Sequence, residues 1–313
     1  MAVVAPAGPI PHARLVQGVA VLERLGFDVR LGAHVLGREG YLAGTDRERA
    51  LDLVSLWARK DVAAVFCARG GYGTARIVDA LTPAFLRRHP KVFCGFSDIT
   101  TLHAACARAG LISFYGPMVA WDLAHGAVKP PRARAKAVAL ATATAISKSG
   151  GFDEASLRAM LMESGKGAVI GSPAVEPIVR GRATGRLAGG CLSMLVATLG
   201  TPEEIDTAGT ILVLEDEKEP PYRIDRMLTQ LRRAGKLDRV RGLVLGDFPE
   251  CHSPGFELAD LLRDRLGDLG VPVAWRFPIG HTLQPNVTLP LLARATLDAG
   301  KGTLTIEESP TRR

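Results

Sequence analysis

The stretch KVFCGFSD, residues 91–98, is the segment from which the fold of the first half of the chain can be inferred. A short apolar run ends here at Gly-Phe-Ser, and a helix-like segment follows directly. The same succession of apolar run, turn and helix-like segment occurs from residue 2 and again from residue 62. Apolar strands that alternate with helices are typical of a parallel sheet covered on both faces. We therefore expect an N-terminal α/β domain of Rossmann-like type.

The pattern changes after residue 122. Residues 123–174 contain a Pro-Pro pair and an Ala/Thr/Lys-rich stretch, and we interpret them as a partly helical connector. Strand-like runs return from residue 175, and near the C-terminus they follow one another without intervening helices. This order indicates antiparallel or barrel-like sheet. The expected organisation is an N-terminal domain over 1–122, the connector, and a C-terminal mixed or barrel-like domain over 175–313.

The composition excludes several classes of protein. The 313 residues are 47% hydrophobic and 23% charged, as in ordinary globular proteins. The net charge of +7 is spread without a block of like charges, so we expect no nucleic-acid partner. None of the five cysteines forms a C-x-x-C pair, which favours reduced thiols and a cytoplasmic location. We expect no signal peptide, no membrane span, no metal site and no cofactor.

Ser97 stands where the apolar run would pass into a helix. The carboxyl ends of such strands are where ligands bind in open α/β sheets. A helix N-terminus beside the hydroxyl would offer N–H groups to a developing oxyanion. The turn resembles a nucleophile elbow that lacks its second glycine. Serine is also a favoured helix N-cap, so the local pattern leaves both interpretations open.

Three further segments could carry chemistry. The glycine-rich ARGGYG, residues 68–73, fits an oxyanion hole or a tight turn; a dinucleotide loop would need a third glycine that is missing. Glu215 and Asp216 end an apolar strand, a position that is also common at solvent boundaries. His281 lies in a loop after another apolar strand, where it could serve as a general base or have no role.

Taken together, the segments resemble the LD-carboxypeptidases, a family of serine peptidases. The likeness extends over nearly the whole chain, and the segments occur in the order that the family shows. The segments that carry it are VVAPAGP at 3–9, ARGGYG at 68–73, GFSDIT at 95–100, YGPM at 115–118, GRLAGGCLSMLVATLGTP at 185–202, LEDEKEPPYRIDRML at 214–228 and GHTLQPNVTLPL at 280–291.

The resemblance implies a catalytic triad of Ser97 as nucleophile, Glu215 as acid and His281 as base. These residues come from both halves of the chain, so the active site is expected in the groove between two domains. With this mechanism in view, we expect the backbone N–H groups of Gly71 and Asp98 to form the oxyanion hole.

The resemblance further implies the substrate and the assembly. The substrate would be a murein tetrapeptide, cut before its terminal D-alanine during peptidoglycan recycling, and the enzyme would be a homodimer. A terminal carboxylate needs a cationic or N–H partner, which Arg69 or Arg223 could supply, and Tyr72 is a further candidate for substrate binding. Asp216 is expected to line the groove.

One departure and two alternatives remain. The family usually has a glycine after the final Leu-Pro-Leu, where this chain has Leu292. The microcin-immunity branch of the same family cleaves peptidyl or aminoacyl adenylates with a similar triad. The intact ARGGYG and the shorter chain favour the murein branch. A ligand-binding protein without catalysis would tolerate the loss of the Ser97 hydroxyl.

Overall fold

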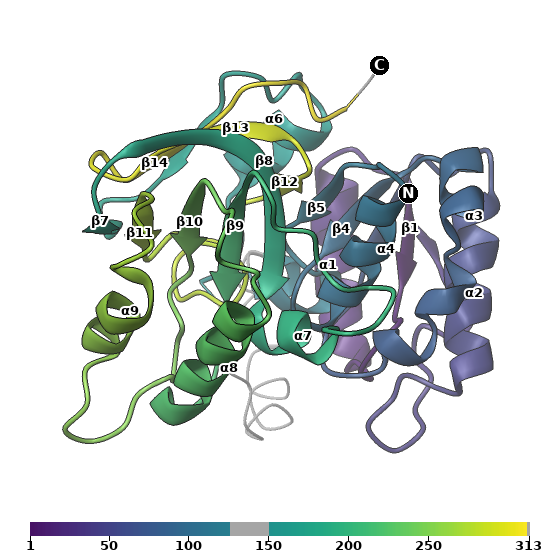
Figure 1. The fold of residues 1–313 in the computed structure, drawn as a ribbon. Coiled ribbons are helices and arrows are strands. Elements are labelled where there is room, and N and C mark those ends of the chain that lie inside the picture. The colour runs from purple at the N-terminus through teal and green to yellow at the C-terminus, as the bar shows by residue number, and fades with distance from the viewer. Residues whose placement is uncertain (126–149, 312–313) are drawn as a thin grey trace, which may run out of the picture.

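The computed structural model describes residues 1–125 and 150–311, which form two β-sheets with helices around them (Figure 1). The first sheet is mainly parallel and the second is mixed, so the expected fold class is confirmed. The expected connector over 123–174 lies partly outside the described residues, because 126–149 are not among them. None of the helices in the described part of the chain has the length and apolar character needed to cross a membrane.

The first sheet has six strands in the order β12-β5-β4-β3-β1-β2. The five N-terminal strands are parallel, and β12 joins the edge beside β5 in antiparallel orientation. The strands are β1 (Ala2–Val4), β2 (Arg30–Leu31), β3 (Ala64–Cys67), β4 (Val92–Gly95), β5 (Ser113–Tyr115) and β12 (Leu289–Leu291). The helices of this part are α1 (His12–Arg24), α2 (Asp46–Ala58), α3 (Pro83–Arg88) and α4 (Thr100–Arg108).

The second sheet has eight strands in the order β6-β14-β13-β8-β9-β10-β11-β7. Its centre, from β8 to β11, is parallel, and antiparallel strands flank it on both sides. The strands are β6 (Val169–Gly171), β7 (Glu176–Val179), β8 (Arg182–Cys191), β9 (Thr210–Glu215), β10 (Gly242–Leu245), β11 (Val273–Trp275), β13 (Arg294–Asp298) and β14 (Thr303–Ile306). The helices are α6 (Glu154–Leu161), α7 (Leu192–Ala197), α8 (Pro221–Arg233) and α9 (Leu258–Leu266).

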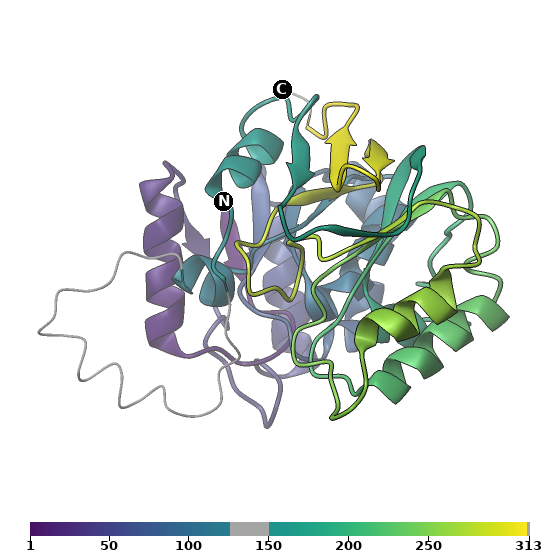
Figure 2. The ribbon, with the colours of Figure 1, turned by 90° about the vertical axis from the view of Figure 1, so that its left-hand side faces the viewer.

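Strand β9 shows why the second sheet is buried on both faces. Its side chains alternate in direction, as strand geometry requires. Ile211 and Val213 belong to the apolar core shared with the first sheet, whereas Leu212 and Leu214 belong to a second core with α7, α8 and α9. Figure 2 shows α8 and α9 lying together in green, on the side of the molecule away from the purple α1. The second sheet is thus a middle layer between these helices and the first sheet.

The chain between the two sheets carries His281 and is held at both ends. It leaves the second sheet at β11 and enters the first sheet as β12, where Leu289 pairs with Tyr115 of β5. Halfway along, the Asn286 side chain accepts a hydrogen bond from the Gly280 N–H at 3.0 Å. The position of His281 therefore depends on how the two sheets meet.

Two segments near Ser97 differ from the expected helices. ARGGYG is followed by the 3₁₀ turns Thr74–Arg76 and Val78–Ala80 rather than by an α-helix. The Thr74 N–H donates to the Asp98 carboxylate at 2.9 Å, so a side chain from another loop sets the backbone there. Helix α4 begins only at Thr100, after a 3₁₀ turn that includes Ser97.

The contact between α1 and the segment Val119–Leu123 provides a test of the packing. Gly18 of α1 faces the backbone there, and a Cβ at this position would lie 1.8 Å from the Val119 carbonyl oxygen. We expect Gly18→Ala to lower the free energy of unfolding by about 1–3 kcal/mol, the usual cost of overpacking. Urea unfolding followed by circular dichroism measures this. The control Val16→Ala replaces a side chain that is 52% exposed on the same helix. It should change the free energy of unfolding by less than about 0.5 kcal/mol.

Candidate active site

A cavity of about 220 Å³ lies where the carboxyl end of β4 meets those of β8 and β9. Its lining combines residues from both halves of the chain. They are Arg69, Gly70, Gly71, Ser97, Asp98, Met118, Trp121, Cys191, Ser193, Met194, Asp216, Glu217 and His281. The cavity is thus bordered by six of the seven segments quoted from the sequence.

Ser97 follows β4 in a strained backbone conformation. Its φ is 65°, a left-handed value that is uncommon for residues other than glycine. The ARGGYG loop passes directly over it, since a Cβ at Gly70 would lie 3.1 Å from the Ser97 hydroxyl oxygen. Within the described residues this hydroxyl makes no hydrogen bond to another side chain or to the backbone. A strained turn that presents a free hydroxyl to a cavity is the arrangement of a nucleophile elbow.

Asp98 fixes the ARGGYG loop against the Ser97 turn. It is buried, and its carboxylate and its backbone carbonyl accept hydrogen bonds from the N–H and the hydroxyl of Thr74, at 2.9 and 2.6 Å. Burial raises the pKa of Asp98, although the hydrogen bonds from Thr74 oppose that shift. Gly71, with φ 113°, lies beside Asp98 in the lining of the cavity. The two backbone positions expected for the oxyanion hole therefore border the same space as Ser97.

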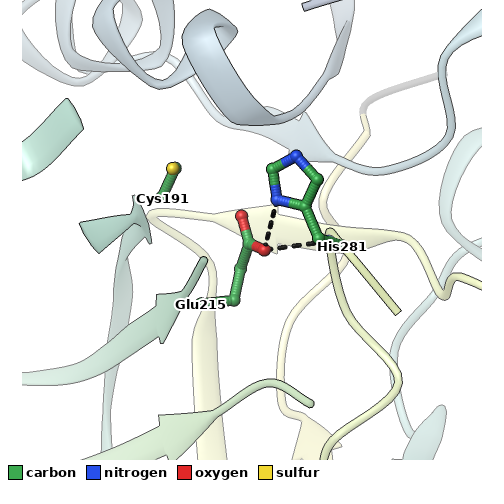
Figure 3. A group of neighbouring side chains, drawn as sticks. All are labelled: Cys191, Glu215 and His281. Atoms are coloured by element: carbon green, nitrogen blue, oxygen red, sulfur yellow. Dashed lines mark hydrogen bonds and ion pairs between the residues drawn. The ribbon is translucent and has the colours of Figure 1, made fainter. Parts of the chain in front are cut away.

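Glu215 and His281 form a hydrogen-bonded pair (Figure 3). Nδ1 of His281 lies 2.7 Å from Oε2 of Glu215, and the His281 backbone N–H donates to the same oxygen at 2.9 Å. Gly280 is what permits this approach, because its φ is 62° and a Cβ there would lie 2.4 Å from the Glu215 carboxyl carbon. The carboxylate fixes the ring, and Figure 3 shows the other ring nitrogen directed away from Glu215.

Tyr115, at the end of β5, connects this pair to Ser97. Its hydroxyl donates to Oε1 of Glu215 and accepts a hydrogen bond from the Ser97 N–H at 3.3 Å. Burial and the charge of Glu215 raise the pKa of Tyr115 well above its usual value, so the phenol remains a donor. Tyr115 thus links the turn of Ser97 in the first sheet to the Glu215 carboxylate in the second.

A second carboxylate faces the opposite side of His281. Oε1 of Glu217 lies 3.4 Å from Nε2 of His281. Burial by itself would lower the pKa of His281, but the charge and hydrogen bond of Glu215 and the charges of Glu217 and Asp216 outweigh it and raise the pKa to about 9. The imidazole is therefore held in its protonated form at neutral pH, between two carboxylates.

Cys191, Glu215 and His281 also have the donor types of a zinc site. One ligand atom from each lies within 4.8 Å of the others (Figure 3). Two of these atoms would need to lose a proton before they could bind a metal. Nδ1 of His281 shares a hydrogen bond with Glu215, and burial together with the charges of Asp216 and Glu215 raises the pKa of the Cys191 thiol well above its usual value. The hydrogen bonding thus favours an acid–histidine pair.

The structure brings most of the expected site residues together. Ser97, Gly71, Asp98, Arg69 and His281 line the cavity, and Glu215 lies behind His281. Arg69 also donates from Nη1 to the Pro9 carbonyl at 2.9 Å.

Two expected substrate-binding residues lie apart from this lining. Tyr72 is 47% exposed and contacts the ring of Tyr41. Arg223 on α8 faces Glu219, with Nη1 and Oε2 3.4 Å apart.

Other residues of the site were not expected from the sequence. Tyr115 lies in the segment YGPM and Cys191 in GGCLSML, both of which were recognised as motifs without a role for these side chains. Glu217 directly follows Glu215 and Asp216, the two acids for which a role was expected. A search for polar residues at the carboxyl end of every expected parallel strand would have found Tyr115.

Comparison with known proteins identifies the same segments. The model of the LD-carboxypeptidase N-terminal domain matches residues 1–116, and that of the C-terminal domain matches 184–297. A Streptomyces coelicolor protein with the provisional name of a carboxypeptidase is 44% identical over 98% of this chain and 93% of its own. The murein tetrapeptide carboxypeptidase of Pseudomonas aeruginosa is 33% identical over 96% and 94%. The crystal structure of the muramoyltetrapeptide carboxypeptidase from Oxalobacter formigenes superposes with a TM-score of 0.78 at 30% identity, covering 99% and 100%.

A more distant relative has a different named role. The microcin C7 self-immunity protein of Escherichia coli is 27% identical over 97% of this chain and 91% of its own.

The pairing of His281 with two carboxylates should make stability depend on pH. Its pKa of about 9 in the folded protein exceeds the ordinary value of 6.5, so its stabilising effect is complete below pH 6.5 and is lost as the pH rises through 9. Relative to His281→Gln, the wild-type free energy of unfolding should fall by about 3 kcal/mol between about pH 6 and 10. Denaturant titrations at each pH measure this difference. A constant difference would contradict the pairing.

Proposed function

The chain belongs to the LD-carboxypeptidase family, and on this premise we propose that it is a serine carboxypeptidase that releases the terminal D-alanine of murein tetrapeptides. The observation that carries the proposal is the cavity in which Ser97, on its strained turn, shares the lining with a His281 that Glu215 orients. Relatives named as murein tetrapeptide carboxypeptidases support the choice of substrate.

The proposed chemistry is acyl transfer through an acyl-enzyme. Neutral His281 takes the Ser97 proton at Nε2 as the hydroxyl attacks the scissile carbonyl, and then gives the proton to the leaving amine of D-alanine. Glu215 holds Nδ1 and stabilises the imidazolium that forms between these steps. Water then attacks the ester by the same route in reverse. The N–H groups of Gly71 and Asp98 are proposed to bind the oxyanion.

Arg69 is the candidate partner for the substrate's terminal carboxylate. It is an arginine in the cavity lining, whereas Arg223 faces Glu219 on α8. Among the described residues only one of its guanidinium nitrogens is engaged, with the Pro9 carbonyl, which leaves other N–H groups to meet a ligand. A charge-assisted pair here would fix the end of the peptide and so determine which bond lies above Ser97.

We further propose that the protein acts in the cytoplasm as a homodimer, in peptidoglycan recycling. The five cysteines support the location, since all are free and buried, as is usual in a reducing compartment. The family resemblance supports the dimer.

Release of D-alanine from a murein tetrapeptide, by wild type and by Ser97→Ala, tests the mechanism. Removal of the nucleophile should lower kcat by at least about 10³-fold. A chelator should leave the wild-type rate unchanged, because no step uses the Cys191–Glu215–His281 group to bind a metal. Circular dichroism of the variant controls for folding.

Two outcomes would contradict the mechanism, and one would redirect it. Retained activity in Ser97→Ala, or loss of wild-type activity with chelator alone, would overturn the serine mechanism. Turnover of an aminoacyl-sulfamoyl adenosine and not of the tetrapeptide would favour the immunity-type activity.

The role of Arg69 makes a separate prediction. Arg69→Met should lower kcat/KM by roughly 10- to 100-fold, the effect of losing a hydrogen bond to a charged group. The matched control Arg223→Met should retain the wild-type value. With a tetrapeptide whose C-terminus is amidated, wild type and Arg69→Met should react equally slowly. Equal sensitivity of the acid and amide substrates to Arg69→Met would show that Arg69 does not bind the carboxylate.

A further inference from the structure

Glu217 forms an ion pair with Nε2 of His281, the ring nitrogen that is proposed to accept the proton of Ser97. A general base has to be neutral and must face the hydroxyl that it deprotonates. In the structure, Nε2 of His281 and Oε1 of Glu217 form an ion pair at 3.4 Å, and within the described residues Nε2 makes no hydrogen bond to Ser97. The ion pair with Glu217 favours the protonated ring, so it has to be weakened before His281 can act as a base.

The Glu217 carboxylate is accessible to a ligand. Its side chain is 25% exposed and lines the cavity. Its other oxygen lies 3.3 Å from Nζ of Lys218, a side chain that is 46% exposed, and such surface pairs are weak. A carboxylate has about four lone-pair sites, so Glu217 can accept a further donor.

The charges of the lining indicate what that donor is. Besides Glu217, the described lining contains the carboxylates of Asp98 and Asp216, and its cations are Arg69 and His281. A ligand that suits this cavity carries an anionic and a cationic group. The tetrapeptide has both, because the residue before its terminal D-alanine is a diamino acid with a free ammonium group.

We propose that Glu217 is a specificity residue that binds the side-chain ammonium of the diamino acid and thereby frees Nε2 of His281 for Ser97. This inference rests on the proposed function and adds how the substrate is selected. The ammonium replaces the imidazolium as the partner of Glu217. A substrate with an uncharged side chain leaves Glu217 on His281 and is cleaved slowly.

The other groups around His281 leave Glu217 as the one that can move. Glu215 is fully buried and held by Tyr115. Asp216 accepts the Ser193 N–H at 2.8 Å and is directed toward α7. Among the described neighbours are also the Phe96 ring, whose centroid lies 5.0 Å from that of the imidazole, and the Cys191 thiol, whose pKa is raised by burial.

The test compares two tetrapeptides that differ only in the third residue, lysine or norleucine. Wild type should prefer lysine in kcat/KM by roughly 10- to 100-fold, the effect of a hydrogen bond between charged groups. Glu217→Gln should bring this ratio close to one. Glu219→Gln, a matched change two residues away in the same loop and outside the cavity lining, should keep the wild-type ratio.

A pH profile separates this role from a structural one. With the norleucine peptide, the acid limb of kcat/KM should lie about one pH unit lower in Glu217→Gln than in wild type, because one of the carboxylates that favour the imidazolium is gone. A lysine preference that persists in Glu217→Gln would overturn the proposal. The proposal would also be overturned if Glu217→Gln lost activity equally on both peptides and the acid limb of its kcat/KM profile did not move.

The preference for the lysine peptide can also be measured as binding affinity, without turnover. Titration calorimetry on Ser97→Ala and on Ser97→Ala/Glu217→Gln gives the Kd of each peptide. Tighter binding of the lysine peptide that requires Glu217 supports the inference, and equal binding of both peptides to Ser97→Ala contradicts it. Absence of D-alanine release by wild type would count against the proposed function alone.

Discussion

The site depends on one buried charge, the carboxylate of Glu215. It is fully buried, and hydrogen bonds from Tyr115, from Nδ1 of His281 and from the His281 backbone N–H compensate its charge. A buried carboxylate without such partners would be destabilising by several kcal/mol. Because Tyr115 lies in the first sheet and Glu215 in the second, the two sheets have to meet here for the charge to be tolerated. The same interaction that joins the halves of the molecule also orients the imidazole of His281.

The backbone around Glu215 is shaped by this requirement. A Cβ at Gly246 would lie 2.6 Å from the Cβ of Glu215, and one at Gly280 would overlap its carboxyl group. Both positions therefore need glycine. Strand β12 adds a second constraint, since it returns the chain to the first sheet soon after His281. The histidine is thus placed by the packing of two sheets, and not by its loop alone.

The parts of this arrangement that are local in the sequence could be predicted, and those that depend on contacts between distant segments could not. The apolar run before Ser97 and the strand before Glu215 each identify a strand end, and the family motifs associate them with His281. The role of Tyr115 could not be predicted, because its hydrogen-bond partners are 18 and 100 residues away in the sequence. The 3₁₀ turns after ARGGYG were missed for the same reason, because a hydrogen bond from Thr74 to Asp98, 24 residues apart, sets them.

The three consecutive acids after β9 illustrate the limit most clearly. In the sequence Glu215, Asp216 and Glu217 are equivalent as charges at a strand end, but β9 ends at Glu215, and each of the three side chains has different contacts. Glu215 points into the contact between the sheets, Asp216 toward the N-terminus of α7, and Glu217 lies at the open cavity. Their exposure follows the same division: the first two are buried, whereas Glu217 remains partly exposed. The buried carboxylates of Glu215 and Asp216 hold neighbouring groups in place. Glu217 is accessible, so it is the carboxylate that can exchange the imidazolium of His281 for the ammonium group of a ligand.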